Sequence, residues 1–183
     1  MRKLSSVPAV IALISVVLSC SLVNRFSPIG GDMNRTTELW PDVPRMDHFA
    51  PSDMEMPLPI KIVVRTVLNN MWRLNKEGED RTPATGDWIV FTTTDSPADV
   101  QNFYTNARMT SFGQWQASDK QTCVDGKDKG LNGTLCVYQK IVDKKVVGLA
   151  IIAGQDEKTK QTNVFFLRVE SPATDDDIRR LQK

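Results

Sequence analysis

Four consecutive strand-like segments in the second half of the sequence constrain the fold more than any other feature. They are rich in β-branched and aromatic residues and are bounded by turn residues. A tight turn at Asp143–Lys145 and a polar loop over residues 154–162 separate the last three of them. Connections this short join antiparallel neighbours, so we expect an antiparallel meander. The four segments are Gln114–Val124, Leu135–Val142, Val146–Ala153 and Asn163–Val169.

A further strand and a helix precede this meander. Trp88–Thr93 has the aromatic and β-branched content of a strand. The helix after it is expected to begin with Ser96 as N-cap, Pro97 at the first helical position and Asp99 in the first turn. Gly113 is expected to end it. The sequence therefore predicts an α+β fold, with an antiparallel sheet of about five strands, a strand–helix–strand unit followed by the meander, and helices packed on one face.

Two more helices are predicted at the ends of the domain. Residues 59–74 carry an apolar stripe at helical spacing, with lysine, arginine and asparagine on the other side. β-branched residues weaken its intrinsic helix propensity, so a strand over its first half is the alternative. Residues 175–183 place acids before bases, which complements a helix dipole. We therefore assign one globular domain to residues 59–183. The stripe consists of Ile60, Val63, Val64, Val67, Leu68 and Met71.

Charge and histidine content exclude several function classes. The 183 residues include 23 Lys and Arg against 22 Asp and Glu, which leaves no broad basic surface for nucleic acid. His48 is the only histidine, so a multi-histidine metal site is excluded and a Ser-His-Asp or Cys-His set would have to use it. No phosphate loop, dinucleotide fingerprint or nucleophile elbow occurs. The acid pairs Asp95/Asp99 and Asp175/Asp177 stand at predicted helix starts, where capping explains them.

The N-terminus has the organisation of a bacterial export signal. Arg2 and Lys3 precede an apolar run, Val7–Leu18, that is shorter than the about 20 residues of a spanning helix. The segment Val17–Cys20 resembles the lipobox of bacterial lipoprotein precursors. The resemblance implies a cleaved signal peptide over residues 1–19 and an acylated Cys20 that attaches the chain to the extracytoplasmic side of a bacterial membrane. An ordinary secretory signal or an uncleaved anchor is the alternative.

Residues 20–58 contain five of the ten prolines, a sixth follows directly at Pro59, and the segment shows no hydrophobic periodicity. Proline removes backbone donors and favours extended conformations, so this segment is predicted to be a tether rather than packed structure. It is more apolar than a spacer requires, so part of it should lie against the domain or a partner. The predicted partner-binding residues are Leu39, Trp40, Met46, Phe49, Met54 and Met56. Met46, Met54 and Met56 carry thioether groups, which together with His48 suit Cu(I). Copper handling is therefore a further hypothesis.

The three cysteines predict one disulfide. If Cys20 is acylated, Cys123 and Cys136 remain as a pair in an oxidising compartment. They flank a polar, glycine-rich stretch, so a disulfide would join two antiparallel strands at the base of a long hairpin loop. A redox-active pair would favour Cys-x-x-Cys or a helix N-terminus, and neither is present. Lysines at ligand positions exclude a calcium loop between the two cysteines.

The segment Asp87–Trp115 resembles a module of small uncharacterised bacterial lipoproteins that has no assigned activity. It combines the aromatic strand with Asp95–Val100, Phe103-Tyr104 and Phe112–Trp115. The resemblance supports the strand–helix–strand unit and implies no catalytic residue. The leading hypothesis is a non-catalytic, lipid-anchored extracytoplasmic protein without a cofactor that serves as an accessory subunit of a membrane or envelope complex. The alternative is a small-molecule-binding lipoprotein or an enzyme with an unfamiliar site.

Overall fold

The computed structural model describes residues 33–57, 85–117, 123–125 and 132–181. All of them belong to one compact unit, Gly31–Lys183. The predicted signal peptide, Cys20 and the helix predicted over residues 59–74 lie outside the described residues. The described part is mostly β structure with a few short helices.

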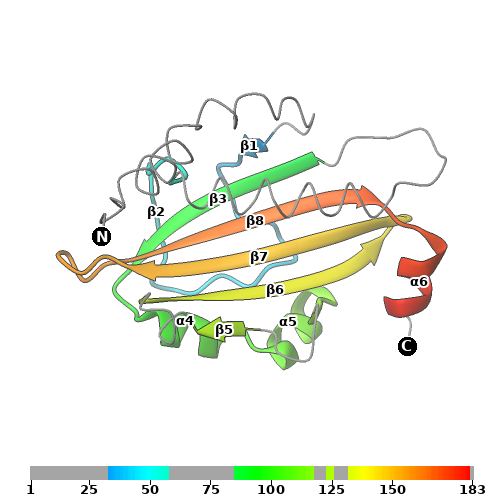
Figure 1. Cartoon of the computed structure of the whole chain (residues 1–183). Helices are drawn as coiled ribbons and strands as arrows, with labels where there is room; N and C mark the ends of the chain where they lie inside the picture. Colours follow the sequence, from blue (N-terminus) through cyan, green and yellow to red (C-terminus); the bar gives the residue numbers. More distant parts are fainter. Residues whose placement is uncertain (1–32, 58–84, 118–122, 126–131, 182–183) are drawn as a thin grey trace, which may run out of the picture. The chain divides into compact units, whose positions relative to one another are not determined.

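A mixed sheet of eight strands forms the body of the described domain (Figure 1). The order is β1-β3-β8-β7-β6-β4, with β2 also paired to β3 and β5 to β6. Only β1 and β3 are parallel among the described pairs. The strands are β1 Met33–Arg35, β2 Ala50–Pro51, β3 Thr85–Thr93, β4 Gln116–Ala117, β5 Cys123–Asp125, β6 Gly133–Val142, β7 Lys145–Gln155 and β8 Thr162–Pro172.

This architecture agrees with a β-rich α+β fold, but the predicted number of about five strands is wrong. Two short strands, β1 and β2, add to the edge of β3. The strand predicted at Gln114–Val124 is represented by two short strands, β4 and β5, that pair with β6 separately. Both differences occur at the edges of the sheet, where strands are short and their pairing depends on segments far away in the sequence.

The hairpin β6–β7 has a regular register throughout. Residue pairs run from Gly133 opposite Gly154 to Val142 opposite Lys145. The two connecting residues, Asp143 and Lys144, have φ angles of 49° and 61°. Positive φ at both positions is the geometry of a type I′ turn, whose twist matches that of the strands it joins. The tight turn predicted at this place is confirmed.

The single helix predicted after β3 is instead two helices, α4 (Pro97–Phe103) and α5 (Asn106–Gly113). Ser96 caps α4 as predicted: its hydroxyl accepts from the Asp99 N–H, and the Asp99 carboxylate accepts from the Ser96 N–H. The Ser96 hydroxyl also donates to the Asp99 carboxylate, and this hydrogen bond, together with that from the Ser96 N–H, lowers the pKa of Asp99. A second cap, Thr105, starts α5 and causes the break.

The end of α5 also differs in detail from the prediction. Gly113 is the last helical residue, and Gln114 takes the left-handed conformation that ends the helix, with φ of 59°. The predicted C-terminal helix is confirmed as α6, Asp175–Leu181. Asp177 accepts a hydrogen bond from the Thr174 N–H, so this acid caps the start of the helix.

Alternation along the strands gives the sheet two apolar faces. The helix face carries Leu149, Ile151 and Phe166, which pack in one core with residues of α4 and α5. Figure 1 shows these helices below the sheet. The second face carries Leu167 and Val169, which form a smaller cluster with Met56. Elements that cover one face therefore cannot contact the other.

Residues 36–49 form a loop whose two ends lie at the same edge of β3. At one end β1 pairs Arg35 with Trp88, and at the other end β2 pairs Ala50 with Thr92. Between these ends, Val43, Met46 and Phe49 enter the core of the helix face. Part of the segment predicted to be a tether is therefore packed. Pro41 lies in a turn closed by a hydrogen bond from the Val43 N–H to the Trp40 carbonyl, and the apolar residues that follow pack under the sheet.

Candidate functional site

Partly buried charged residues meet where loop 36–49 crosses the helix face. Asp42 comes from the loop, Lys140 from β6 and Arg168 from β8. Arg168 Nη1 is 3.1 Å from both carboxylate oxygens of Asp42, and Lys140 Nζ is 2.7 Å from Oδ2. The side chains of Lys140, Arg168 and Asp42 are 11%, 16% and 23% exposed. We call these three residues the charged cluster.

Two tryptophans flank the charged cluster. The indole N–H of Trp115 donates to the backbone carbonyl of Asp42 over 2.8 Å. Lys140 Nζ lies 4.4 Å from the centre of the Trp115 ring, and the Arg168 guanidinium lies 5.7 Å from that of Trp40. These distances are those of cation–π contacts. Arg168 therefore binds the loop through the Trp40 ring as well as through Asp42, and Lys140 adds a contact with Trp115.

The end of α5 closes the site. Lys140 Nζ donates to the carbonyl of Gly113 over 2.9 Å. A Cβ added to Gly113 would lie 2.0 Å from the Asp42 carbonyl oxygen, so only glycine allows this approach of loop and helix. The Lys140 ammonium thus has a carboxylate, a carbonyl and an aromatic ring as partners, which is what a cation removed from water requires.

The network continues along the sheet to Glu170. Arg168 Nε is 3.4 Å from one carboxylate oxygen of Glu170, and Lys145 Nζ is 3.2 Å from the other. Glu170 and Lys145 are more exposed, at 31% and 57% of their side chains. The cluster is therefore a structural clamp with a solvent-exposed end, and the positive and negative groups in it neutralise one another.

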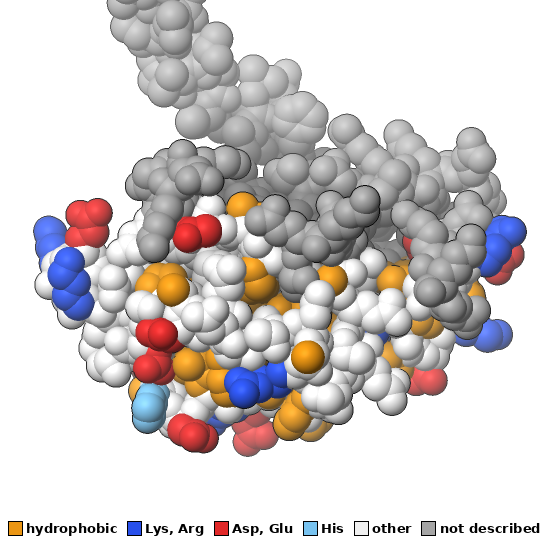
Figure 2. All heavy atoms as spheres, turned by 90° about the horizontal axis from the view of Figure 1, so that it is seen from below, with side chains coloured by type: hydrophobic (Ala, Val, Ile, Leu, Met, Phe, Trp, Pro, Cys, Tyr) orange, Lys and Arg blue, Asp and Glu red, His pale blue; other side chains and the backbone are white. Residues whose placement is uncertain are grey.

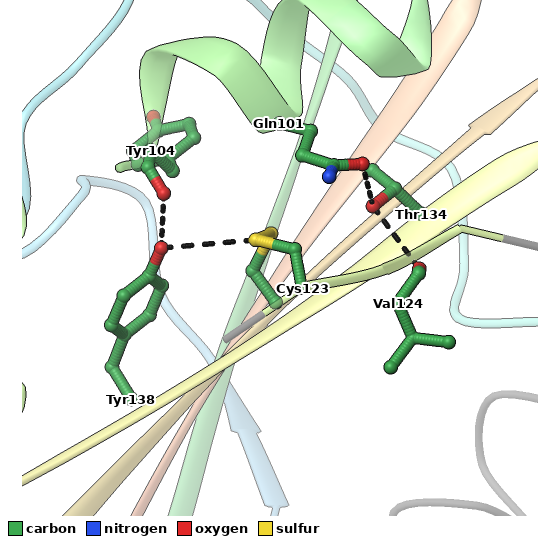
Figure 3. The surroundings of a disulfide bond; sticks show 7 residues. Gln101, Tyr104, Cys123, Val124, Thr134 and Tyr138 are labelled. Carbon is green, nitrogen blue, oxygen red and sulfur yellow. Dashed lines mark hydrogen bonds between the residues drawn. A yellow bond between two sulfur atoms is a disulfide. The ribbon is translucent and has the colours of Figure 1, made fainter. Parts of the chain in front are cut away.

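A second polar connection runs from the disulfide to the loop. Figure 3 shows the Tyr138 hydroxyl pointing to the Tyr104 carbonyl, to which it donates, and towards the Cys123 sulfur, 4.0 Å away. The Tyr104 hydroxyl in turn donates to the Pro44 carbonyl over 2.8 Å. Burial raises the pKa of Tyr138 to about 12 and raises that of Tyr104 further. Both tyrosines therefore stay neutral and act as hydrogen-bond donors.

The predicted cysteine pair is present. Cys123 of β5 lies directly opposite Cys136 of β6, with the two sulfur atoms bonded and the Cα atoms 4.0 Å apart. Beside it, the Thr134 hydroxyl contacts the Val124 carbonyl and the Gln101 side chain of α4 (Figure 3). The disulfide therefore holds the short strand β5 in register and supports the contact between this edge of the sheet and α4.

The residues predicted to bind a partner occupy three environments. Met46 and Phe49 are buried in the core of the helix face, and Met56 is buried on the second face. Leu39 and Trp40 are partly buried against the core, and Met54 is 40% exposed. The predicted docking is intramolecular for the three buried side chains, since their contacts lie within the domain itself. Leu39, Trp40 and Met54 retain exposed surface.

The structure separates the side chains proposed to bind Cu(I). Met46 and Met56 lie in clusters on opposite faces of the sheet. His48 is 73% exposed, and its Nδ1 lies 3.5 Å from Asp95 Oδ2. Asp95 also accepts from the Thr93 hydroxyl, so the pair holds the turn after β3. Within the described residues, no group of three histidine, cysteine or acidic side chains is placed to hold a metal ion.

Exposed aromatic surface lies along α5. Arg108 lies over the ring of Phe103, 4.0 Å from its centre, and its guanidinium donates to the Phe103 carbonyl. Phe112 follows one turn later on the same side of the helix and is 55% exposed. We call Arg108 and Phe112 of α5, together with Phe103 at the end of α4, the α5 surface. Figure 2, seen from below the sheet of Figure 1, shows hydrophobic side chains of this side beside basic ones.

In comparisons with known proteins, no family model, no curated protein and no solved structure matches this chain. In the described part of the chain, the helices are too short or too polar to span a bilayer.

Proposed function

We propose that the chain is a lipid-anchored extracytoplasmic protein that binds a protein partner through the α5 surface and has no catalytic activity of its own. Cys20 would carry the acyl chains that attach it to a bacterial membrane. The partner would be a subunit of a membrane or envelope complex. The observation that carries the partner-binding part is Phe112, a large aromatic side chain 55% exposed next to an arginine already ordered by Phe103.

The chemistry of the α5 surface supports a protein partner. Arginine and aromatic residues contribute most to binding when a partner excludes water from them. Gly113, the residue after Phe112, lies against the Asp42 backbone, so the end of α5 adjoins the part of the loop that carries Leu39 and Trp40. Leu39 and Trp40, which the sequence predicts to bind a partner, therefore lie near the α5 surface. A fitting partner surface is apolar, with a carboxylate opposite Arg108.

The Cys123–Cys136 disulfide supports the extracytoplasmic location. Disulfides persist in oxidising compartments, and export through a lipobox-type signal would deliver the chain to one.

The contacts of the charged residues support the non-catalytic part of the proposal. The Asp42, Lys140 and Arg168 side chains bind one another and the loop backbone, and Asp99 caps α4. In these described contacts each group has a structural role.

The test is recovery of the natively expressed chain in a gentle detergent, followed by intact-mass measurement and identification of bound proteins. We expect a mass that matches Cys20 as an acylated first residue, together with a membrane subunit in stoichiometric amount. Phe112→Asp should remove that subunit, because it places a carboxylate in the apolar contact. Val142→Asp is the matched control, since Val142 is also exposed, at 39%, but belongs to the end of β6.

Each part of the proposal can fail separately. An unmodified chain that retains residues 1–19 would contradict the lipid anchor. A lipidated chain recovered alone would contradict the subunit role and favour the small-molecule alternative, to be tested by ligand screening. Loss of the subunit in both aspartate variants, or in neither, would contradict the assignment to the α5 surface.

A further inference from the structure

The second face of the sheet presents apolar side chains across four strands. The strand register places Leu135, Ile152, Phe165 and Val90 in one row across the sheet, and Val137, Ala150, Leu167 and Trp88 in the next. The following row contains Gln139, Gly148, Val169 and Gly86. An apolar sheet face of this width requires an element packed on it.

Described residues pack on only one half of this face, the half that contains β8. Met33 and Met56 pack beside Leu167 and Val169, which are buried on β8. On β7, Ala150 and Ile152 are only partly buried. A Cβ built on Gly148 meets no described atom within 4 Å, and the same holds for Gly154. Glycine in a strand interior often marks the close approach of another segment. The half of the face formed by β6 and β7 therefore has room for another segment to pack on it.

Residues 58–84 of the chain are flanked by described residues that lie at this face. Residues 58–84 connect Met56, which is buried on the second face, with β3, whose Gly86 shares a row with Val169. The apolar stripe of residues 60–71 lies within that segment. As an α-helix those residues would be about 18 Å long, close to the about 20 Å of β6 between Leu135 and Ile141.

We propose that the second face is the docking site of residues 60–71, which pack on β6 and β7 as an amphipathic helix. Val63, Val64 and Val67 would lie over Ala150 and Gly148, while Lys61 and Arg65 would face solvent. Attachment at both ends makes the docking intramolecular, so this segment competes well with any separate partner for the same surface. This proposal does not depend on the proposed function.

The experiment measures how fast a maleimide labels a single cysteine on the second face. Ala150→Cys is introduced into the full chain with Cys20→Ser, and the Cys123–Cys136 disulfide stays oxidised and does not react. Val142→Cys, at an exposed position, is the reference. We expect the thiol at position 150 to react at least about tenfold more slowly than the reference, because labelling requires local opening. Val64→Asp with Val67→Asp should remove most of this protection.

The control is Lys61→Asp with Arg65→Asp, which changes charge on the other side of the stripe and should leave the labelling rate unchanged. Equal labelling at positions 150 and 142 without any change in the stripe would overturn the proposal. Protection that disappears on dilution would assign the face to a second copy of the chain instead. If the aspartate pair unfolds the domain, Val64→Ala with Val67→Ala replaces it, and no acceleration in that variant would also overturn the proposal.

Discussion

Loop 36–49 and the hairpin β6–β7 are both held firmly in this domain, but by contacts of opposite kinds. The hairpin is closed by two turn residues and paired residue by residue with its neighbour in sequence. The loop is held by Tyr104, Trp115 and Arg168, which lie 60, 73 and 126 positions away from their partners in it. Irregular backbone is therefore no sign of a loosely attached segment here, because distant side chains determine its position.

The largest expected effect concerns the apolar residues of the loop. Phe49 stacks on Phe91, with ring centres 5.4 Å apart, and lies edge-on to Phe166 at 5.9 Å. Because all three rings are buried, Phe49→Ala should lower the free energy of unfolding by about 3–5 kcal/mol, as much as Phe166→Ala. Urea unfolding of both variants checks this. Met54→Ala, at an exposed position, is the control and should change stability by less than about 0.5 kcal/mol.

If Phe49→Ala lowers the free energy of unfolding by less than about 1 kcal/mol, loop 36–49 is not held as firmly as the hairpin, since surface residues typically give values of that size or less. It would return residues 36–49 to the role of a tether, which the sequence alone suggests. A loss equal to that of Phe166→Ala would show that the loop contributes as much to stability through this contact as the sheet does.

The prediction from sequence succeeded where local patterns determine the structure. Alternation and turn residues were sufficient for the central strands, for the turn at Asp143 and Lys144, and for the capping of α4 by Ser96. The pairing of Cys123 with Cys136 followed from the assignment of Cys20 to a lipobox, which leaves these two, and from the glycine-rich stretch between them. Each of these features depends on residues close together in the chain.

The same approach missed the charged cluster. Asp42, Lys140 and Arg168 are single charged residues in three separate segments, with no shared spacing. Only the folded register of β6, β7 and β8 brings the last two together beneath the loop. One local signal was available for the break between α4 and α5, since Thr105 precedes Asn106 as an ordinary N-cap.

The next prediction tests whether charge holds the loop as hydrophobic contact does. Asp42→Asn keeps the shape of the side chain but leaves Lys140 and Arg168 without its negative charge. The cluster is partly buried, so the loss in unfolding free energy should be about 2 kcal/mol, between the values for exposed and fully buried pairs. Thermal or urea unfolding measures it. Asp53→Asn, which affects the exposed pair with Arg35, should cost less than about 1 kcal/mol.

Equal effects of the two asparagine substitutions would show that the cluster contributes no more than a surface ion pair. The loop would then be held by its apolar residues and tryptophan contacts alone. A larger loss for Asp42→Asn that persists in 1 M salt would confirm that the cluster is shielded from solvent, because the Debye length falls to about 3 Å at that ionic strength.

The smallest expected effect concerns the turn of the hairpin β6–β7. Lys144 has φ of 61° in the turn, a conformation that glycine adopts without strain. Lys144→Gly should therefore raise the free energy of unfolding, by about 0.5 kcal/mol after the entropy cost of glycine. Lys145→Gly is the control: Lys145 is the first residue of β7 and pairs with Glu170, so the same substitution one position later should destabilise the protein. Urea midpoints that move in opposite directions for these neighbours would show that backbone conformation governs the turn, whereas destabilisation by both would contradict it.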